Sequence, residues 1–218
     1  EMYVYLQGCI ASKRRQPGDD MLSRVLALSG DEAWSDEEVM GLCWLITLAG
    51  LDTVTAAIGF TMMWLARSPD LRRSLIAHPE LVGPVIEEIL RLEPPALTTP
   101  RVTNEDVEVC GTVIPAGSEV VLCLATANRD CGRDAPDVID PAAEGRGHMT
   151  FGGGIHRCLG SHLARREIRL VVEEFHKLIP DYELAPGFEP EVVWPSATLH
   201  LRALRLVFPV QAARGGRA

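Results

Sequence analysis

Apolar positions recur along this 218-residue chain mostly at helical spacing, with two stretches where the period changes. The spacing predicts a helix near the start, a Pro-Gly break at residues 17–20 and a short helix over residues 21–28. Longer helices are predicted over residues 35–66, 69–78, 80–92 and 159–178. Residues 101–122 alternate around turn residues, and residues 182–210 do so more weakly. These patterns predict a mainly α fold with small antiparallel β-sheets.

The longest helical pattern opens with Ser35 and Glu38, the spacing of a capping box. From Val39 to Ala66 the only charged residue is Asp52. A helix of this length spans roughly 45 Å at about 1.5 Å per residue. One interpretation is a membrane span. The central Asp costs about 2.5–3.5 kcal/mol to insert, and Gly and Thr interrupt the run, so a long core helix of a globular protein is favoured and no membrane span is expected.

Charge and cysteine usage narrow the class of protein. Lys and Arg total 21 against 30 Asp and Glu, a formal net charge of −9, which disfavours general binding to nucleic acid or anionic lipid. The 6 cysteines are dispersed, without a CxxC pair, and no signal peptide opens the sequence. A reduced, cytoplasmic protein is therefore expected. Because the sequence opens inside a helical pattern, we expect a fragment that lacks an N-terminal portion.

The segment FGGGIHRCLG, residues 151–160, is the most informative part of the sequence. Its glycines permit positive φ angles and a close approach of the backbone to a flat ligand. Cys158 lies just before a predicted helix, whose free N–H groups favour thiolate over thiol. Gly160 removes a side chain behind the sulfur, and Phe151 is placed to pack against the sulfur and exclude water.

Three other interpretations of this segment are possible. A glycine-rich phosphate loop is one, although the GxGxxG order and a preceding strand are absent. A zinc site formed by His156, Cys158 and His162 is another, although their spacing matches no common zinc signature. The third is a buried structural cysteine in a glycine turn.

The same segment resembles the haem-binding signature of the cytochrome P450 family, F-G-x-G-x-H-x-C-x-G, at each fixed position. Glu88 and Arg91 match the family's ExxR motif, and their i, i+3 spacing places both side chains on one helix face, where they can bind each other and a third segment. Residues 49–53, AGLDT, resemble the family's [A/G]-G-x-[D/E]-T motif on the helix distal to the haem.

The resemblance implies a fold and a domain assignment. It covers residues 1–210, is closest to the bacterial soluble branch, and implies the C-terminal portion of the cytochrome P450 fold. Because whole members of the family are much longer, residues 1–218 are expected to be the C-terminal haem-binding half of one domain, with the N-terminal half absent.

The resemblance also implies a haem b cofactor, with Cys158 as the ligand of the iron. The residues that match the family around the sulfur are Phe151, Gly152 and Gly160. The residues that match the family's contacts to the haem propionates are Arg101, His148 and His156.

The resemblance also implies roles for four residues of the distal helix: two small residues leave room for oxygen, and two polar residues transfer protons. Ala49 and Gly50 would leave room beside the haem for dioxygen and water. Thr53 would bond back to the Ala49 carbonyl and bend the helix. Asp52 and Thr53 would then relay protons to the oxygen.

Substrate and electron donor follow from the same resemblance. The residues that match the family's substrate contacts are Ile46, Leu97, Thr98, Thr99, Thr198 and Leu199. Apolar and small residues on the distal helix favour an apolar small-molecule substrate. Residues 145–177 hold six cations and three carboxylates on an otherwise acidic chain. This basic segment suits an acidic ferredoxin, steered electrostatically, unless it is only a solvated helix face.

The implied activity is that of a haem-thiolate monooxygenase, which inserts one oxygen atom from O2 into the substrate with electrons from a ferredoxin and its reductase. A truncated or degenerate haem-binding fragment without turnover is the alternative. A peroxide-driven enzyme of the same fold is disfavoured, because Asp52 and Thr53 suggest a proton relay for dioxygen chemistry.

The sequence departs from the family at two places. An Arg that completes the ExxR network in the family falls at Ala143 here, and Arg146 is the nearest candidate to replace it. Asn128-Arg129-Asp130 is followed by Cys131, where family members usually carry Pro. Both departures concern how the loop before the cysteine segment is anchored.

Overall fold

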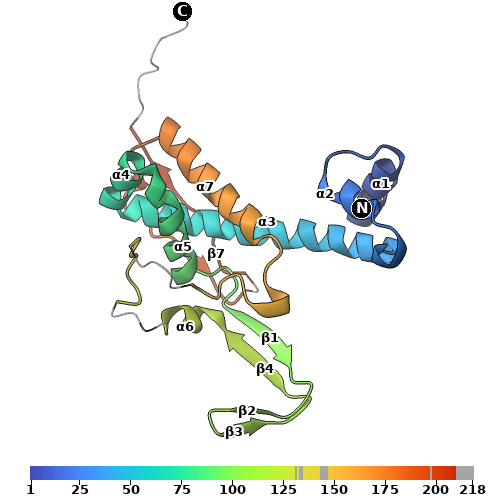
Figure 1. The fold of residues 1–218 in the computed structure, drawn as a ribbon. Helices are drawn as coiled ribbons and strands as arrows, with labels where there is room; N and C mark the ends of the chain where they lie inside the picture. The colour runs from blue at the N-terminus through green and yellow to red at the C-terminus, as the bar shows by residue number, and fades with distance from the viewer. Residues whose placement is uncertain (131, 133–134, 143–146, 197, 210–218) are drawn as a thin grey trace, which may run out of the picture. The chain divides into compact units, whose positions relative to one another are not determined.

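The structure is a computed structural model that describes residues 1–130, 132, 135–142, 147–196 and 198–209. The chain forms two compact units, Glu1–Leu51 and Asp52–Ala218, and the boundary falls inside the long helix α3 (Asp36–Arg67). Helices dominate both units (Figure 1). Among the described residues, the second unit also has four small two-stranded antiparallel sheets. The predicted fold class is thus confirmed.

The first unit contains α1 (Met2–Arg15), α2 (Met21–Leu26), a 3₁₀ turn (Gly30–Glu32) and the start of α3. Its core joins α1 to the beginning of α3 through Leu6, Ile10, Val39 and Met40. The break predicted at residues 17–20 ends in a cap. Asp20 accepts a 2.9 Å hydrogen bond from the N–H of Ser23 and a 2.7 Å bond from Lys13. These contacts, with that of Lys13 the strongest, lower the pKa of Asp20 to about 2.

The predicted capping box at the start of α3 is present. The N–H of Ser35 donates to Glu38 Oε2 at 2.7 Å, and the N–H of Glu38 donates to Ser35 Oγ at 3.3 Å. Among the described residues, α3 is the one helix long and apolar enough to span a membrane, and 11% of its apolar window is buried. Length and composition alone are weak grounds for a span, because core helices pass the same test.

The part of α3 in the first unit is largely exposed, in contrast to its continuation in the second. Leu45 and Leu51 are 57% and 58% exposed. From residue 56 onward the helix is buried, and Phe60 and Leu65 are at most 1% exposed. The predicted core helix is therefore found in the C-terminal part of α3, whereas its N-terminal part presents apolar side chains to solvent.

The second unit is built on helices that pack around α5. Its helices and 3₁₀ turns are α4 (Pro69–Ala77), η2 (Pro79–Leu81), α5 (Val82–Leu92), α6 (Leu124–Arg129), η3 (Gly154–His156) and α7 (Ser161–Leu178). One hydrophobic cluster joins the end of α3, α4, α5 and α7 through Leu65, Leu75, Val85, Ile89, Ile168 and Val172. The predicted helices are present, although Ser68 makes no side-chain cap at the start of α4.

The strands also follow the predicted pattern. In the meander, β1 (Thr98–Val102) pairs antiparallel with β4 (Glu119–Cys123), and β2 (Val107–Val109) pairs with β3 (Thr112–Ile114). In the tail, β5 (Glu183–Leu184) pairs with β8 (Leu206–Val207), and β6 (Val192–Val193) pairs with β7 (His200–Leu201). The meander begins three residues before the predicted start and leads through β4 directly into α6 (Figure 1).

A buried arginine fixes the chain that leaves α7. Arg72 is 2% exposed and donates to the carbonyls of Leu65 at 2.9 Å and Pro180 at 3.2 Å. It also donates to Asp181 at 2.8 Å, and its guanidinium lies 4.5 Å from the ring centroid of Tyr182. These contacts tie α3 and α4 to the far end of α7, so the helix that starts at the cysteine segment is held at both ends.

Candidate functional site

The cysteine segment forms a tight loop at the start of α7. The N–H of Cys158 donates to the carbonyl of Phe151 at 2.8 Å, which closes the loop on itself. Gly152 and Gly154 have φ angles of 65° and 61°, which L side chains rarely adopt. A Cβ at Gly152 would also lie 3.4 Å from the carbonyl oxygen of His156. The glycines are therefore required by the backbone of this loop.

Cys158 is exposed at the surface of this loop. On either side of it, Ile155 is 97% exposed and Leu159 is 68% exposed. A soft sulfur ligand beside uncovered apolar side chains fits a flat, apolar group that contains a metal, because such a group would cover both kinds of surface. Within the described residues, no three His, Cys, Asp or Glu side chains gather as a metal site, so the zinc alternative gains no support.

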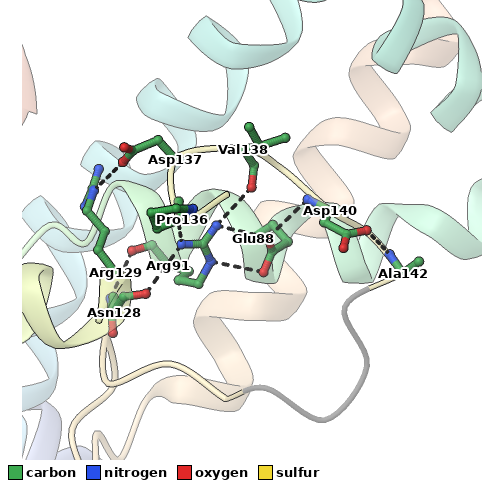
Figure 2. Close-up of polar contacts among 9 residues, drawn as sticks. All are labelled: Glu88, Arg91, Asn128, Arg129, Pro136, Asp137, Val138, Asp140 and Ala142. Atoms are coloured by element: carbon green, nitrogen blue, oxygen red, sulfur yellow. Dashed lines mark hydrogen bonds and ion pairs between the residues drawn. The ribbon is translucent and has the colours of Figure 1, made fainter. Parts of the chain in front are cut away.

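Glu88 and Arg91 lie together inside the second unit (Figure 2). The guanidinium of Arg91 is fully buried and donates to both oxygens of Glu88, at 3.2 and 3.1 Å. It also donates to the carbonyls of Pro136 at 2.6 Å and Val138 at 3.0 Å. Glu88 Oε2 in turn accepts the N–H of Asp140 at 3.2 Å. The pair thus binds the backbone of the loop that follows α6.

Asn128 continues this network toward the cysteine segment. Its Nδ2 donates to the carbonyl of Arg91 at 3.0 Å and to Thr150 Oγ1 at 2.9 Å, while its Oδ1 accepts the N–H of Met149 at 2.6 Å. Thr150 Oγ1 donates to the carbonyl of Leu90 at 2.7 Å. The sequence did not predict this role of Asn128 and Thr150. The side chain of Asn128 is 1% exposed and lies on the buried side of the short helix α6, with Leu124. A polar residue four positions after an apolar one was the signal in the sequence that could have indicated a buried hydrogen-bonding role.

A second, half-buried network lies on the neighbouring residue of α5 and centres on Glu87. Arg165 donates to Glu87 from Nε at 2.6 Å and from Nη2 at 2.8 Å. His148 Nε2 lies 3.0 Å from Glu87 Oε2, and His148 Nδ1 accepts the N–H of Thr150 at 3.2 Å. Since Nδ1 is an acceptor, Nε2 carries the hydrogen and donates it to Glu87. Burial disfavours the charged form of Glu87, but the bonds from His148 and Arg165 outweigh it and lower its pKa to about 2.

The three residues expected at the propionates occupy different surroundings. The side chain of His148 is 5% exposed with both ring nitrogens engaged, so a propionate contact there would require one of those bonds to break. Arg101 on β1 is half-buried and reaches back along its own strand, donating to Thr99 Oγ1 at 2.8 Å. His156 ends the turn η3 and is exposed. None of these positions tests the propionate assignment, which stays a prediction.

Two segments expected to contact substrate lie side by side. The N–H of Leu199 donates to the carbonyl of Pro95 at 2.8 Å, which joins the segment holding Thr198 to the one holding Leu97, Thr98 and Thr99. Leu199 also packs against a cluster on α3 formed by Ala56, Phe60 and Met63. The segment that holds Leu97 is also bound to α6, because the Leu97 carbonyl accepts the N–H of Ala125 at 3.2 Å.

The remaining predicted residues lie on α3 at the boundary between the two units. Ile46, Ala49 and Gly50 belong to the first unit, and Asp52 and Thr53 begin the second. Ile46 is 37% exposed, and a Cβ at Gly50 would meet nothing within 4 Å. The hydroxyls of Thr47 and Thr61 donate to the carbonyls four residues earlier, at 2.8 and 2.7 Å. The same bond from Thr53 to Ala49 stays a prediction.

The basic face of α7 is less positive than its sequence suggests. Arg165 is paired with Glu87, while Arg169 and Lys177 each contact a carboxylate of their own helix at 2.6 Å. The residues on which the anchoring departures depend, Ala143, Arg146 and Cys131, lie outside the described residues.

Comparisons with known proteins identify the family. Residues 72–186 match the family model for Cytochrome P450. Vitamin D(3) 25-hydroxylase of Pseudonocardia autotrophica is 37% identical over 203 residues, which are 91% of this chain and 50% of that protein. The Biotin biosynthesis cytochrome P450 of Bacillus subtilis is 35% identical over 183 residues, 84% of this chain and 46% of that protein. The chain spans about half the length of the curated relatives it matches.

Solved structures agree with the sequence comparison. CYP109E1 of Bacillus megaterium in complex with testosterone has a TM-score of 0.88 and 32% identity, covering 94% of this chain and 57% of that one. P450BioI in complex with an acyl carrier protein that carries hexadec-9Z-enoic acid has a TM-score of 0.86 and 33% identity, covering 95% and 53%. The cysteine loop, the family match and the shared fold lead to one conclusion: this chain belongs to the cytochrome P450 family.

Proposed function

We propose that this chain supplies the haem-binding part of a haem-thiolate monooxygenase that inserts one oxygen atom from O2 into an apolar small molecule. The observation that carries the proposal is the loop at the start of α7, where glycines at positive φ present an exposed Cys158 between exposed apolar side chains. Membership of the family implies a haem cofactor, and haem b is the type we propose.

Cys158 would hold the haem iron as a thiolate. The N-terminal end of α7 favours that charge, because free N–H groups and the helix dipole stabilise an anion there. The carbonyl of Phe151 accepts the N–H of Cys158 and so holds the backbone at the cysteine. When bound, the haem supplies dioxygen activation, which a thiolate ligand promotes by donating electron density. For the propionates we propose Arg101 and His156, with His148 as a further candidate.

On the distal side we propose that Asp52 and Thr53 move protons toward the site where oxygen is reduced. Carboxyl and hydroxyl groups at adjacent positions of one helix can pass a proton between a water and a bound oxygen atom. Ala49 and Gly50, three residues earlier on the same helix, are the small residues that the family resemblance assigns to the space for oxygen.

The substrate proposal rests on apolar surroundings. Leu97 and Leu199 lie on adjoining segments, and Leu199 packs on the apolar cluster of α3. Thr98, Thr99 and Thr198 supply hydroxyls on the same two segments, and Ile46 adds an apolar side chain on α3. An apolar molecule with few polar groups fits such a lining. The testosterone complex of CYP109E1 and the acyl chain carried in the P450BioI complex are ligands of that chemical kind.

Electrons would arrive from an acidic ferredoxin or a similar donor at the basic face of α7. Arg166 on α7 and Arg157 in the loop before it are exposed and would provide complementary charge. We place the protein in the cytoplasm, which agrees with free thiols at the five cysteines that the structure describes.

Isotopically labelled dioxygen tests the proposed reaction. The haem-loaded protein, given a ferredoxin, its reductase and a panel of apolar small molecules, is expected to form a product that gains one labelled oxygen atom, detected by mass spectrometry. Oxygen drawn from water or peroxide instead would contradict the proposal. Intact thiolate-haem spectra without any product across the panel would favour a haem-binding module without turnover.

Replacing Thr53 with alanine tests the proton relay. The variant is expected to consume reducing equivalents at a rate close to that of the wild type while releasing more peroxide and less product, because protons reach the oxygen less efficiently. The measurement compares peroxide and product formed per reducing equivalent. Thr47→Ala, which removes a hydroxyl from the same helix two turns earlier, is the control. Unchanged coupling in Thr53→Ala would remove this residue from the relay.

A further inference from the structure

Three half-buried side chains, those of Glu87, Arg165 and Phe151, contact one another beside the cysteine loop, and neither Glu87 nor Arg165 has a role in the proposed haem site. Glu87 on α5 receives two hydrogen bonds from Arg165 on α7, at 2.6 and 2.8 Å. The guanidinium carbon of Arg165 lies 4.3 Å from the ring centroid of Phe151. The carbonyl of Phe151 accepts the N–H of Cys158 at 2.8 Å. These contacts run in an unbroken series from α5 to the cysteine.

We infer that Glu87 and Arg165 form a clamp that presses Phe151 into place and so positions Cys158 for its metal. The clamp rests on the proposed function, because it concerns the same cysteine and the same haem. Both are positioning residues, because Glu87 binds Arg165 and Arg165 packs on the ring of Phe151; Arg165 also interacts electrostatically with Cys158 across the loop.

The geometry of Arg165 suits this role better than that of a surface cation. A guanidinium is planar and donates in a fixed fork, so one edge can bind a carboxylate while one face packs on an aromatic ring. Arg165 uses Nε and Nη2 for Glu87 and its flat face for Phe151. Lysine offers the charge without the plane, so it would keep the ion pair and lose the contact with the ring.

Glu87 is itself held in place by its surroundings. Its neighbour Glu88 belongs to the fully buried pair with Arg91, and its own carboxylate is further held by His148 at 3.0 Å. The ring of His148 lies 5.8 Å from that of Phe151. Phe151 is therefore flanked by two side chains that share one carboxylate, and that carboxylate sits on the most buried helix of the unit.

Alternative roles explain less of this arrangement. A docking cation for an electron donor would be exposed and unpaired, whereas Arg165 is 30% exposed and bidentate to Glu87. A simple ion pair between α5 and α7 would not need its guanidinium to lie over the ring of Phe151, the residue whose backbone carbonyl accepts the N–H of Cys158.

The first test measures hydrogen exchange of the Cys158 amide in the haem-free protein by NMR. Arg165→Met and Glu87→Gln are expected to speed this exchange about tenfold relative to the wild type, because Phe151 is freed and its carbonyl leaves the amide more often. Arg202→Met, which removes an exposed Arg–Glu pair elsewhere in the same unit, is expected to leave the exchange rate unchanged. Equal exchange in the wild type, Arg165→Met and Glu87→Gln would overturn the clamp.

The second test measures haem transfer from the loaded protein to an excess of apomyoglobin. Arg165→Met is expected to lose haem about tenfold faster, with a smaller share showing the carbon monoxide-bound band of thiolate ligation. Arg165→Lys is expected to match Arg165→Met within about twofold, since it keeps only the charge. Full retention of haem by Arg165→Lys would overturn the role of the stacked guanidinium.

A double-mutant cycle keeps the inference testable if either variant is unstable. In a Phe151→Leu background, Arg165→Met is expected to change haem transfer by less than about twofold, because its effect passes through the ring. Additive effects would contradict the clamp. If the wild type never shows the thiolate band while the amide exchange responds as expected, the proposed function fails and the positioning of Cys158 stands.

Discussion

Replacing Cys158 with alanine is expected to abolish the carbon monoxide-bound Soret band of thiolate-ligated haem while leaving the protein folded. The thiol is exposed, and the loop's backbone bond to Phe151 involves the N–H of residue 158, which alanine retains. Surface substitutions of this kind change stability by about 0.5 kcal/mol or less. The haem-free variant should therefore unfold at the same denaturant concentration as the wild type, and the spectral loss should be nearly complete.

The matched control is Cys110→Ala, which removes another exposed thiol at the turn between β2 and β3. It should keep the thiolate band at full amplitude. Haem-loaded Cys158→Ala with an unchanged band would assign the iron ligand to another residue and would remove the basis of the proposed function. A band shifted to that of nitrogen ligation in the wild type itself would have the same consequence.

Local patterns of the sequence predicted most of the secondary structure because their causes lie within a few residues. The capping box of Ser35 and Glu38 is formed by side chains three residues apart, and the structure shows both of its hydrogen bonds. Apolar spacing likewise placed α5 and α7, whose buried residues recur at helical period. Ser68 is the counterexample: its position is right for a cap, yet its side chain makes no such bond.

The burial of α3 shows what local sequence patterns do not predict. Its composition predicted a core helix along its full length, and the structure buries Val39 and Met40 near its start and most of the part from residue 56 onward, but leaves the stretch between them largely exposed. Apolar composition predicts that a helix face is buried, but it does not predict which element of the chain packs against that face. The exposed residues Leu45, Leu48 and Leu51 follow from that difference.

Around the site, contacts between residues close in sequence were predicted, and contacts between distant residues were not. Glu88 and Arg91 are three residues apart, so the spacing alone placed them together. Arg91 also donates to the carbonyls of Asn128, Pro136 and Val138, and such contacts cannot be predicted from residue type because every residue has a backbone carbonyl. Glu87 and Arg165 are 78 positions apart, so only the packing of α5 on α7 brings them together.

Replacing Arg91 with methionine is expected to cost about 3–5 kcal/mol of folding stability, the penalty typical of breaking a buried ion pair. Methionine fills similar space but leaves the nearly buried carboxylate of Glu88 without its cation and the carbonyls of Pro136 and Val138 without a donor. Native proteins are stable by only about 5–15 kcal/mol, so a cost of this size removes a large share of the folding stability. Chemical denaturation followed by circular dichroism measures the change.

The chain contains a matched control for this prediction. Arg73 forms an ion pair with Asp70 at the same i, i+3 spacing on α4, but the two side chains are 65% and 97% exposed. Arg73→Met is expected to change stability by about 1 kcal/mol or less, because water screens an exposed pair and solvates the carboxylate that remains. The two substitutions differ in burial and in the carbonyls that Arg91 binds. Equal costs for Arg91→Met and Arg73→Met would show that the buried network contributes nothing beyond an ordinary surface pair.

Arg91→Lys separates charge from geometry at the same position. An ammonium can replace the ion pair with Glu88, but its three donors on one nitrogen cannot also reach the carbonyls of Asn128, Pro136 and Val138. We therefore expect lysine to recover less than half of the stability lost in Arg91→Met. Since Asn128 joins Arg91 to Thr150 in the approach to the cysteine loop, haem retention should fall in parallel with stability. Recovery of wild-type stability by lysine would reduce this network to its charge alone and would separate it from the positioning of Cys158.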